Sequence, residues 1–225
     1  MYRWMKPGRR RKIFLKTYMI KTIAFDLGGV IVTIDQSQAI SRFKEIGATD
    51  VEKWLDPYTQ TGIFGDLEHG LISAEDFRRE LSRLIGKEVT REACAYAWQG
   101  YAKEVPMRNL ELVKKLRQEG YRVVLLSNTN PYMMMWAMSD AFDGQGHSLA
   151  DYFDHCYLSY ELKMMKPSEE IFRQVLKQEQ TFPNEILFVD DGPRNVAAAS
   201  QLGFRTFCPE NGKDWTKEIY NYLND

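Results

Sequence analysis

The chain has few of the residues that build disulfide frameworks or histidine-based metal centres. Its three cysteines, Cys94, Cys156 and Cys208, lie far apart and form no CxxC pair. This spacing indicates reduced thiols rather than a disulfide framework or a zinc site. The three histidines also lack the spacing of metal ligands. Any metal bound by this chain is therefore expected to have oxygen ligands.

Long apolar runs and a surplus of one charge are absent as well. No stretch approaches the roughly 20 apolar residues that a membrane span needs. The formal net charge of −1 gives no general attraction to nucleic acid or membrane. Residues 1–18 form a basic N-terminal extension without an apolar core of signal-peptide length. We expect a cytoplasmic protein, with a basic arm for nucleic acid or membrane as the alternative for residues 1–18.

The sequence does contain a regular alternation of short apolar segments and helical patterns. Leu110, Val113 and Leu116 repeat along one helical face, and Gly120 supplies a stop. Such an alternation predicts an α/β protein with a Rossmann-like parallel-sheet core and helices on both faces. The expected strands are residues 20–27, 121–128, 155–160, 185–191 and 204–208.

Residues 36–105 break this alternation and contain no convincing buried strand. Ser73 and Asp76 form a capping-box pattern in front of an apolar helical stripe. We therefore expect an inserted α-helical cap domain at 36–105, between the two parts of the core at 19–35 and 106–225.

Polar residues stand where three of the expected strands end. Ligands of an open parallel sheet bind beyond the carboxyl ends of its strands. Each of these residues alone is typical of a helix cap, a turn or a loop, but together they indicate a site. They are Asp26, Ser127, Asn128, Asp190 and Asp191, with Lys166 in the loop before residues 168–180.

This set of side chains suits a metal ion and a phosphate group. Three convergent carboxylates repel one another unless a cation lies between them, and aspartate oxygens suit Mg²⁺. A lysine, a hydroxyl and free backbone amides suit a phosphate. An ionised Asp26 that faces such a phosphate can attack phosphorus in line and form an aspartyl phosphate.

Four segments, "FDLGGV", "LLSNTN", "KMMKPSEEIF" and "FVDDGPRN", resemble the successive motifs of the haloacid dehalogenase superfamily. The spacing is similar to that of the branch with a helical cap after the first motif, and the resemblance extends from Met19 to the carboxyl terminus. It implies that Asp26 is the nucleophile and that Mg²⁺ is the cofactor. It also implies that Ser127, Asn128 and Lys166 hold the phosphate. The implied metal ligands are Asp26, the backbone carbonyl of Gly28, and Asp191, with Asp190 acting through water.

The acidic pair Asp190–Asp191 favours a phosphatase over a dehalogenase, because a metal-free dehalogenase has no use for two further carboxylates around its nucleophile. Phosphatases of the superfamily usually have a second Asp two residues after the nucleophile, where this chain has Gly28. That residue protonates the leaving alcohol, and acid–base help is worth roughly 10²–10⁴ in rate. Asp35, Asp66, Glu68 or His69 could supply the proton instead, but we interpret each of them as a cap or surface residue.

The absence of an acid at position 28 lowers the rate least when the leaving group is itself acidic, because such a group needs less protonation. The first motif also resembles that of a bacterial branch that includes a glucose 1-phosphate phosphatase. We therefore expect a small phosphorylated metabolite as substrate, in particular a sugar 1-phosphate. A non-catalytic phosphate-binding protein and a sugar phosphomutase remain as alternatives.

Two apolar regions lie outside these motifs. The segment "PYMMMWAM" (131–138) is expected to pack beneath the cap or against the core, with self-association as the alternative. We accordingly expect a monomer or a weak homodimer. Aromatic residues of the insert are expected mostly in its core, with one or two facing Asp26. They are Trp54, Tyr58, Phe64, Trp98 and Tyr101.

Overall fold

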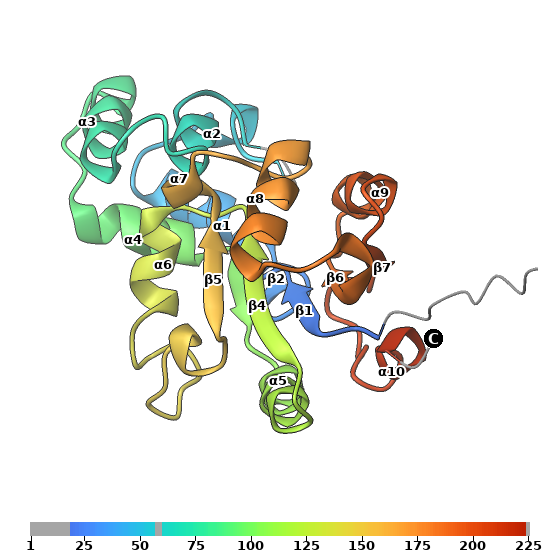
Figure 1. Ribbon diagram of the computed structural model, residues 1–225. Helices are drawn as coiled ribbons and strands as arrows, with labels where there is room; N and C mark the ends of the chain where they lie inside the picture. Colours follow the sequence, from blue (N-terminus) through green and yellow to red (C-terminus); the bar gives the residue numbers. More distant parts are fainter. Residues whose placement is uncertain (1–18, 57–59, 224–225) are drawn as a thin grey trace, which may run out of the picture.

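A five-stranded parallel sheet forms the centre of the molecule (Figure 1). The computed structural model describes residues 19–56 and 60–223, so the basic extension and Tyr58 lie outside the described residues. The strand order is β5–β4–β1–β6–β7, and every neighbouring pair is parallel. The strands are β1 (Thr22–Phe25), β4 (Arg122–Ser127), β5 (His155–Leu158), β6 (Ile186–Val189) and β7 (Arg205–Phe207).

Helices cover both faces of this sheet, as the sequence predicts. In β1, Ile23 and Phe25 point to one face, in a cluster with α5 (Met107–Gln118). Ala24 points to the other face, in a cluster with α8 (Glu169–Glu179). This two-residue alternation within fully buried strands confirms the predicted α/β fold. The remaining helices of this part are α6 (Pro131–Ala137), α7 (Ser159–Leu162), α9 (Pro193–Gln201) and α10 (Tyr220–Leu223).

The insert after β1 is a helical segment with its own core. Phe43, Phe64, Phe77 and Trp98 are at most 1% exposed, and their rings pack against one another. In Figure 1 this segment lies at the upper left, and α9 and α10 lie at the opposite side. Its helices are α1 (Gln36–Glu45), α2 (Gly62–Glu68), α3 (Ala74–Ile85) and α4 (Arg91–Gln99), with a 3₁₀ turn at Val51–Lys53.

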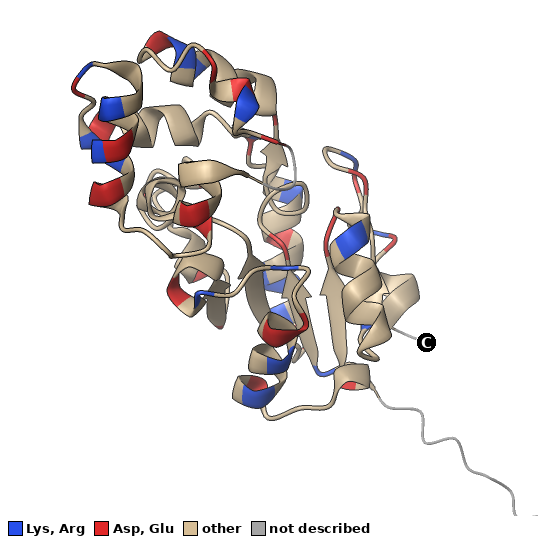
Figure 2. Ribbon diagram, turned by 90° about the horizontal axis from the view of Figure 1, so that it is seen from above, with Lys and Arg blue, Asp and Glu red and all other residues tan. Residues whose placement is uncertain are grey.

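The ends of these helices follow the sequence signals. Ser73 and Asp76 form the predicted capping box of α3. Charges of both signs alternate along the outer helices of the segment (Figure 2). On α3 they form i,i+3 ion pairs, such as Arg78–Glu75 and Arg83–Glu80. Exposed pairs of this kind add little stability each and keep the outer face hydrated.

One element of the insert was not predicted. Ala102–Glu104 forms a short strand, β3, which pairs antiparallel with β2 (Thr33–Ile34). The two strands form a small ribbon where the chain leaves and re-enters the core. The sequence does not indicate this strand, because one half-buried alanine and two exposed charged residues make no apolar run.

Helix α6 joins the core to the helical segment. Tyr132 and Met133 belong to the buried cluster of that segment, and the Tyr132 hydroxyl donates to the Ala74 carbonyl at 2.6 Å. The predicted packing of "PYMMMWAM" beneath the insert is thus confirmed.

None of the helices formed by residues 19–56 and 60–223 has the length and apolar character that a bilayer span requires.

Candidate active site

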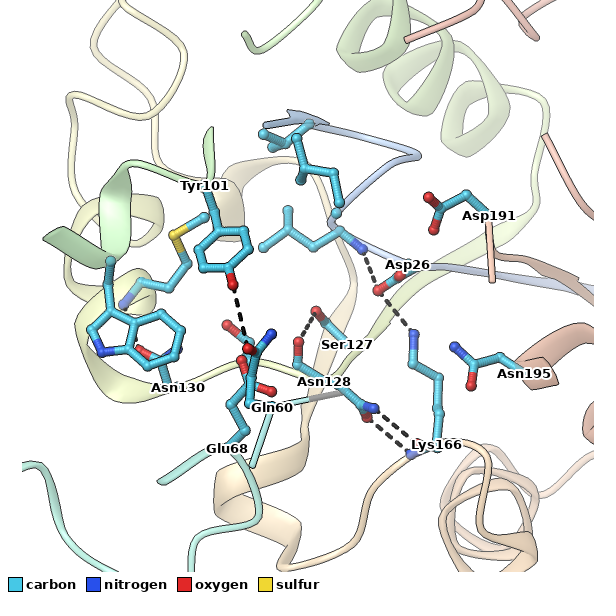
Figure 3. Close-up of a pocket in the computed structure, with 17 residues that line it drawn as sticks. Asp26, Gln60, Glu68, Tyr101, Ser127, Asn128, Asn130, Lys166, Asp191 and Asn195 are labelled. Carbon is cyan, nitrogen blue, oxygen red and sulfur yellow. Dashed lines mark hydrogen bonds and ion pairs between the residues drawn. The ribbon is translucent and has the colours of Figure 1, made fainter. Parts of the chain in front are cut away.

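A small pocket lies at the carboxyl ends of the central strands, between the sheet and the helical segment (Figure 3). Its volume is about 110 Å³. All the predicted site residues line it except Asp190, which is fully buried directly beside it. The core contributes Asp26, Leu27, Gly28, Ser127, Asn128, Lys166, Asp191 and Asn195, and the helical segment contributes Gln60, Glu68, Trp98 and Tyr101.

Asp26 stands at the tip of β1, between β4 and β6. Its main-chain amide continues the sheet by donating to the Val189 carbonyl at 2.8 Å. Its carboxylate accepts from the Leu27 amide at 2.7 Å and lies 2.9 Å from Lys166 Nζ. Burial raises the pKa of Asp26 to about 6, and the Lys166 charge limits the rise. One carboxylate oxygen is therefore held by two donors at the edge of the pocket.

Lys166 is the cation of the core wall and is 4% exposed. Its Nζ bridges Asp26 at 2.9 Å and Asp190 at 2.6 Å, and it also donates to the Leu126 carbonyl at 2.8 Å. Burial opposes the charged form, but the two carboxylates outweigh it and raise the pKa of Lys166. The ammonium group is thus fixed and charged beside Asp26.

Asp190 is held by donors on every side. Besides Lys166, its carboxylate accepts from the Gly192 amide at 2.8 Å and from Asn195 Nδ2 at 3.0 and 3.1 Å. These bonds fix Asp190 as the anchor of the lysine side chain. Asn195, which the sequence reasoning missed, positions this anchor.

Ser127, the last residue of β4, and Asn128, which follows it, differ in their contacts. Asn128 uses its side chain as a clamp, because its Nδ2 donates to the Lys166 carbonyl and its Oδ1 accepts from the Lys166 amide, both at 2.9 Å. Its side chain is therefore occupied in placing Lys166. Ser127 Oγ lies at the pocket wall, 3.4 Å from the Asn128 carbonyl, a distance at which a hydrogen bond is weak.

Three carboxylates meet where a cation is expected. Oxygen atoms of Asp26, Asp190 and Asp191 lie within 4.8 Å of one another. Burial, together with the charges of the other two, raises the pKa of Asp191 to about 7. A hard divalent ion would offset this repulsion, and oxygen ligands of this kind are what Mg²⁺ binds. The residues present therefore fit a magnesium ion.

The two glycines after Asp26 have different reasons to be glycine. Gly29 has φ +77°, and a Cβ atom there would lie 2.0 Å from Asp191 Oδ2. Only glycine leaves room for that carboxylate. At Gly28 a Cβ atom would meet only the Ile34 Cγ2 methyl, at 3.2 Å. The backbone does not require glycine at position 28, so a side-chain acid is absent there for another reason.

The wall formed by the helical segment contains the one clear error of the sequence reasoning. Glu68 is neither a cap nor a surface residue, because it is 7% exposed and lines the pocket. Trp98 and Tyr101 line the same wall, as expected of one or two aromatic residues. The Tyr101 hydroxyl donates to Gln60 Oε1 at 3.3 Å. Asp35, in contrast, caps α1 as interpreted, accepting from the Ser37 amide.

The amino-acid sequence of the chain is similar to that of a known protein family. Residues 20–203 match the haloacid dehalogenase-like hydrolase family. The chain belongs to that family. The match spans four of the five strands of the sheet, the helical segment and every predicted site residue, so the resemblance inferred from the four motifs is confirmed.

Three relatives match nearly the whole chain. It is 48% identical over 206 residues to the D-ribitol-5-phosphate phosphatase of Bacteroides thetaiotaomicron, covering 92% of this chain and 100% of the relative. A predicted hydrolase of this family from Porphyromonas gingivalis superimposes with a TM-score of 0.87 at 44% identity, covering 92% and 99%. A family enzyme from B. thetaiotaomicron, solved with magnesium and inorganic phosphate, gives a TM-score of 0.81 at 38% identity, covering 89% and 99%.

Proposed function

We propose that this protein is a magnesium-dependent phosphatase that hydrolyses a small phosphorylated sugar or polyol through phosphorylated Asp26. The observation that supports it most is the convergence of three aspartates and one buried lysine in a single small pocket. The named phosphatase relative and the neighbour solved with magnesium and phosphate support the same reaction. Such a site serves a phosphomonoester and has no evident use in dehalogenation.

The residues divide the work of the first step. Asp26 attacks phosphorus with its pocket-facing carboxylate oxygen, and Lys166 stabilises charge on the phosphoryl oxygens. Ser127 completes the phosphate contacts, and Asn128 holds Lys166 in place. Asp26, Asp191 and the Gly28 carbonyl are the proposed magnesium ligands, with Asp190 beyond them. Bound Mg²⁺ would neutralise charge on the phosphate and favour the ionised form of Asp26.

The substrate class is narrower than a phosphate ester in general. The pocket is small and closed on one side by residues 36–105, which we propose act as a cap that excludes water. Ribitol 5-phosphate, the substrate named for the relative, releases a primary alcohol rather than an anomeric hydroxyl. We therefore propose a polyol or sugar phosphate, without preference for a 1-phosphate.

A panel of phosphate esters with and without Mg²⁺ tests this function. Wild type is expected to hydrolyse a polyol or sugar phosphate only with Mg²⁺. Asp26→Asn should lower kcat/KM by at least about 10⁴-fold, because it removes the nucleophile. Asp140→Asn, at an exposed position outside the pocket, is the matched control. Magnesium-dependent phosphate binding without turnover would instead support the non-catalytic alternative.

A further inference from the structure

Glu68 is a buried carboxyl group that the mechanism above does not use. It ends α2 and lines the pocket together with Asp26. The described residues include no lysine or arginine paired with it. A carboxylate buried without a counterion is costly, so the site favours its protonated form. A protonated carboxyl facing a reaction centre is able to donate a proton.

The position of Glu68 is fixed by the core rather than by the helical segment alone. Its main-chain carbonyl accepts from Ser159 Oγ at 2.6 Å, and Ser159 Oγ in turn accepts from the Thr129 amide at 2.9 Å. Gly70 allows the close approach, since a Cβ atom there would lie 2.1 Å from the Tyr160 carbonyl. These contacts tie Glu68 to the loop after β4, which also holds the phosphate-binding residues.

Asn130 is a polar neighbour of the Glu68 side chain and lowers its pKa in part. Asn130 Oδ1 accepts from the Tyr132 and Met133 amides, at 3.1 and 3.0 Å, so Nδ2 is the atom of Asn130 that can donate. An amide donor of this kind leaves the Glu68 carboxyl group able to carry a proton. Figure 3 shows Glu68 beside Asn130 and Gln60, on the wall away from Lys166 and Asp191.

The electrostatics agree with this geometry. Burial raises the pKa of Glu68 to about 8, the Asn130 hydrogen bond lowers it only in part, and the Asp26 charge adds to the rise. The other titratable groups that border the pocket are Tyr101, Lys166 and Asp191. Burial and the Glu68 charge raise the pKa of Tyr101, so its phenol stays neutral.

Resting on the proposed function, we propose that Glu68 is the general acid and base of the reaction, in place of the carboxyl group missing at Gly28. As Asp26 bonds to phosphorus, the ester P–O bond breaks and its electron pair stays on the leaving oxygen. That oxygen takes the Glu68 proton and departs as the alcohol. In the second step water attacks phosphorus, Glu68 takes its proton, and the bond to Asp26 breaks. Inorganic phosphate leaves, and both carboxyl groups return to their starting states.

Two esters with different leaving groups separate this role from a structural one. Ribitol 5-phosphate releases a poorly acidic alcohol, and p-nitrophenyl phosphate releases an acidic phenol that needs no proton. Glu68→Gln should lower kcat/KM for ribitol 5-phosphate by about 10²–10⁴-fold but less than about tenfold for p-nitrophenyl phosphate. Asp66→Asn, a half-buried residue of the same helix outside the pocket, is the matched control and should affect neither ester.

The pH dependence of wild type gives a second test that needs no variant. kcat/KM for ribitol 5-phosphate should fall above about pH 8, where Glu68 loses its proton, and that for p-nitrophenyl phosphate should not. An equal loss on both esters in Glu68→Gln, no loss, or the same alkaline fall with both esters would overturn the role of Glu68. If wild type hydrolyses no polyol or sugar phosphate of the panel, the proposed function itself fails.

Discussion

The two walls of the pocket differ in how their polar groups are partnered. On the core wall, Lys166 forms ion pairs with Asp26 at 2.9 Å and with Asp190 at 2.6 Å. On the wall of the helical segment, the hydroxyl of Tyr101 donates to the neutral amide of Gln60. Glu68 has no lysine or arginine paired with it among the described residues, and burial raises its pKa. The difference matches the proposed division of tasks, in which the core wall binds phosphate and forms the bond to phosphorus. In the same proposal, the other wall contacts the alcohol part of the substrate and transfers the proton.

Removing the cation of the core wall should have a large effect on every phosphate ester. Lys166→Met is expected to lower kcat/KM by at least about 10³-fold on every phosphate ester, because it leaves Asp26 and Asp190 without their shared counterion. Steady-state kinetics on ribitol 5-phosphate and p-nitrophenyl phosphate measure this, with exposed Lys177→Met as control and circular dichroism to confirm folding. A loss of activity on only one of the two esters would contradict the proposal that the core wall binds the phosphate common to both.

On the wall of the helical segment, Glu68 should make the free energy of unfolding of wild type depend on pH, and Glu68→Gln should remove this dependence. The pKa of Glu68 is raised from 4.5 to about 8, so between these values the folded state keeps a proton that the unfolded state releases. The resulting stabilisation is complete below about pH 4.5 and is lost as pH rises through about 8.

Relative to wild type, Glu68→Gln should therefore gain on the order of 4 kcal/mol in free energy of unfolding between about pH 4.5 and pH 9. Urea unfolding of both proteins without magnesium at the two pH values measures this difference. A pH-independent difference would mean that Glu68 is ionised in the folded state.

The two glycines offer a matched pair within the core wall. Gly29→Ala should raise the magnesium concentration needed for activity by about 10–100-fold, because its Cβ atom would displace the Asp191 carboxylate. Gly28→Ala should change little, since it meets only a methyl group at 3.2 Å. Magnesium titrations of the hydrolysis rate compare the two. Equal magnesium requirements would remove Asp191 from the metal site.

The smallest effect is expected at Tyr101. Tyr101→Phe removes one neutral hydroxyl from the wall of the helical segment and should lower kcat/KM for ribitol 5-phosphate by about fivefold. p-Nitrophenyl phosphate should be hydrolysed as before. Tyr96→Phe, an exposed tyrosine of α4 whose hydroxyl donates to Glu45, is the control. A loss shared by both esters would place Tyr101 with the phosphate site instead.

The same division explains what the sequence could predict. Asp26 and Asp190 follow apolar strands directly, so local pattern and sheet topology were enough to bring them together. Glu68 reaches the pocket through contacts with residues far away in the chain, such as Ser159, 91 positions later. One local signal was present: Glu68 is four residues after buried Phe64, on the apolar face of α2. The strand at residues 102–104 gave no comparable signal.

The most direct test of the account is to locate the covalent phosphate. Wild type is mixed with ribitol 5-phosphate and Mg²⁺, quenched in acid within one turnover, digested and analysed by mass spectrometry. Phosphate is expected on the carboxyl group of Asp26. With p-nitrophenyl phosphate, the amount of phosphorylated Asp26 should be larger in Glu68→Gln than in wild type, because dephosphorylation of the variant lacks its base. Phosphate on another residue, or full turnover by Asp26→Asn, would contradict it.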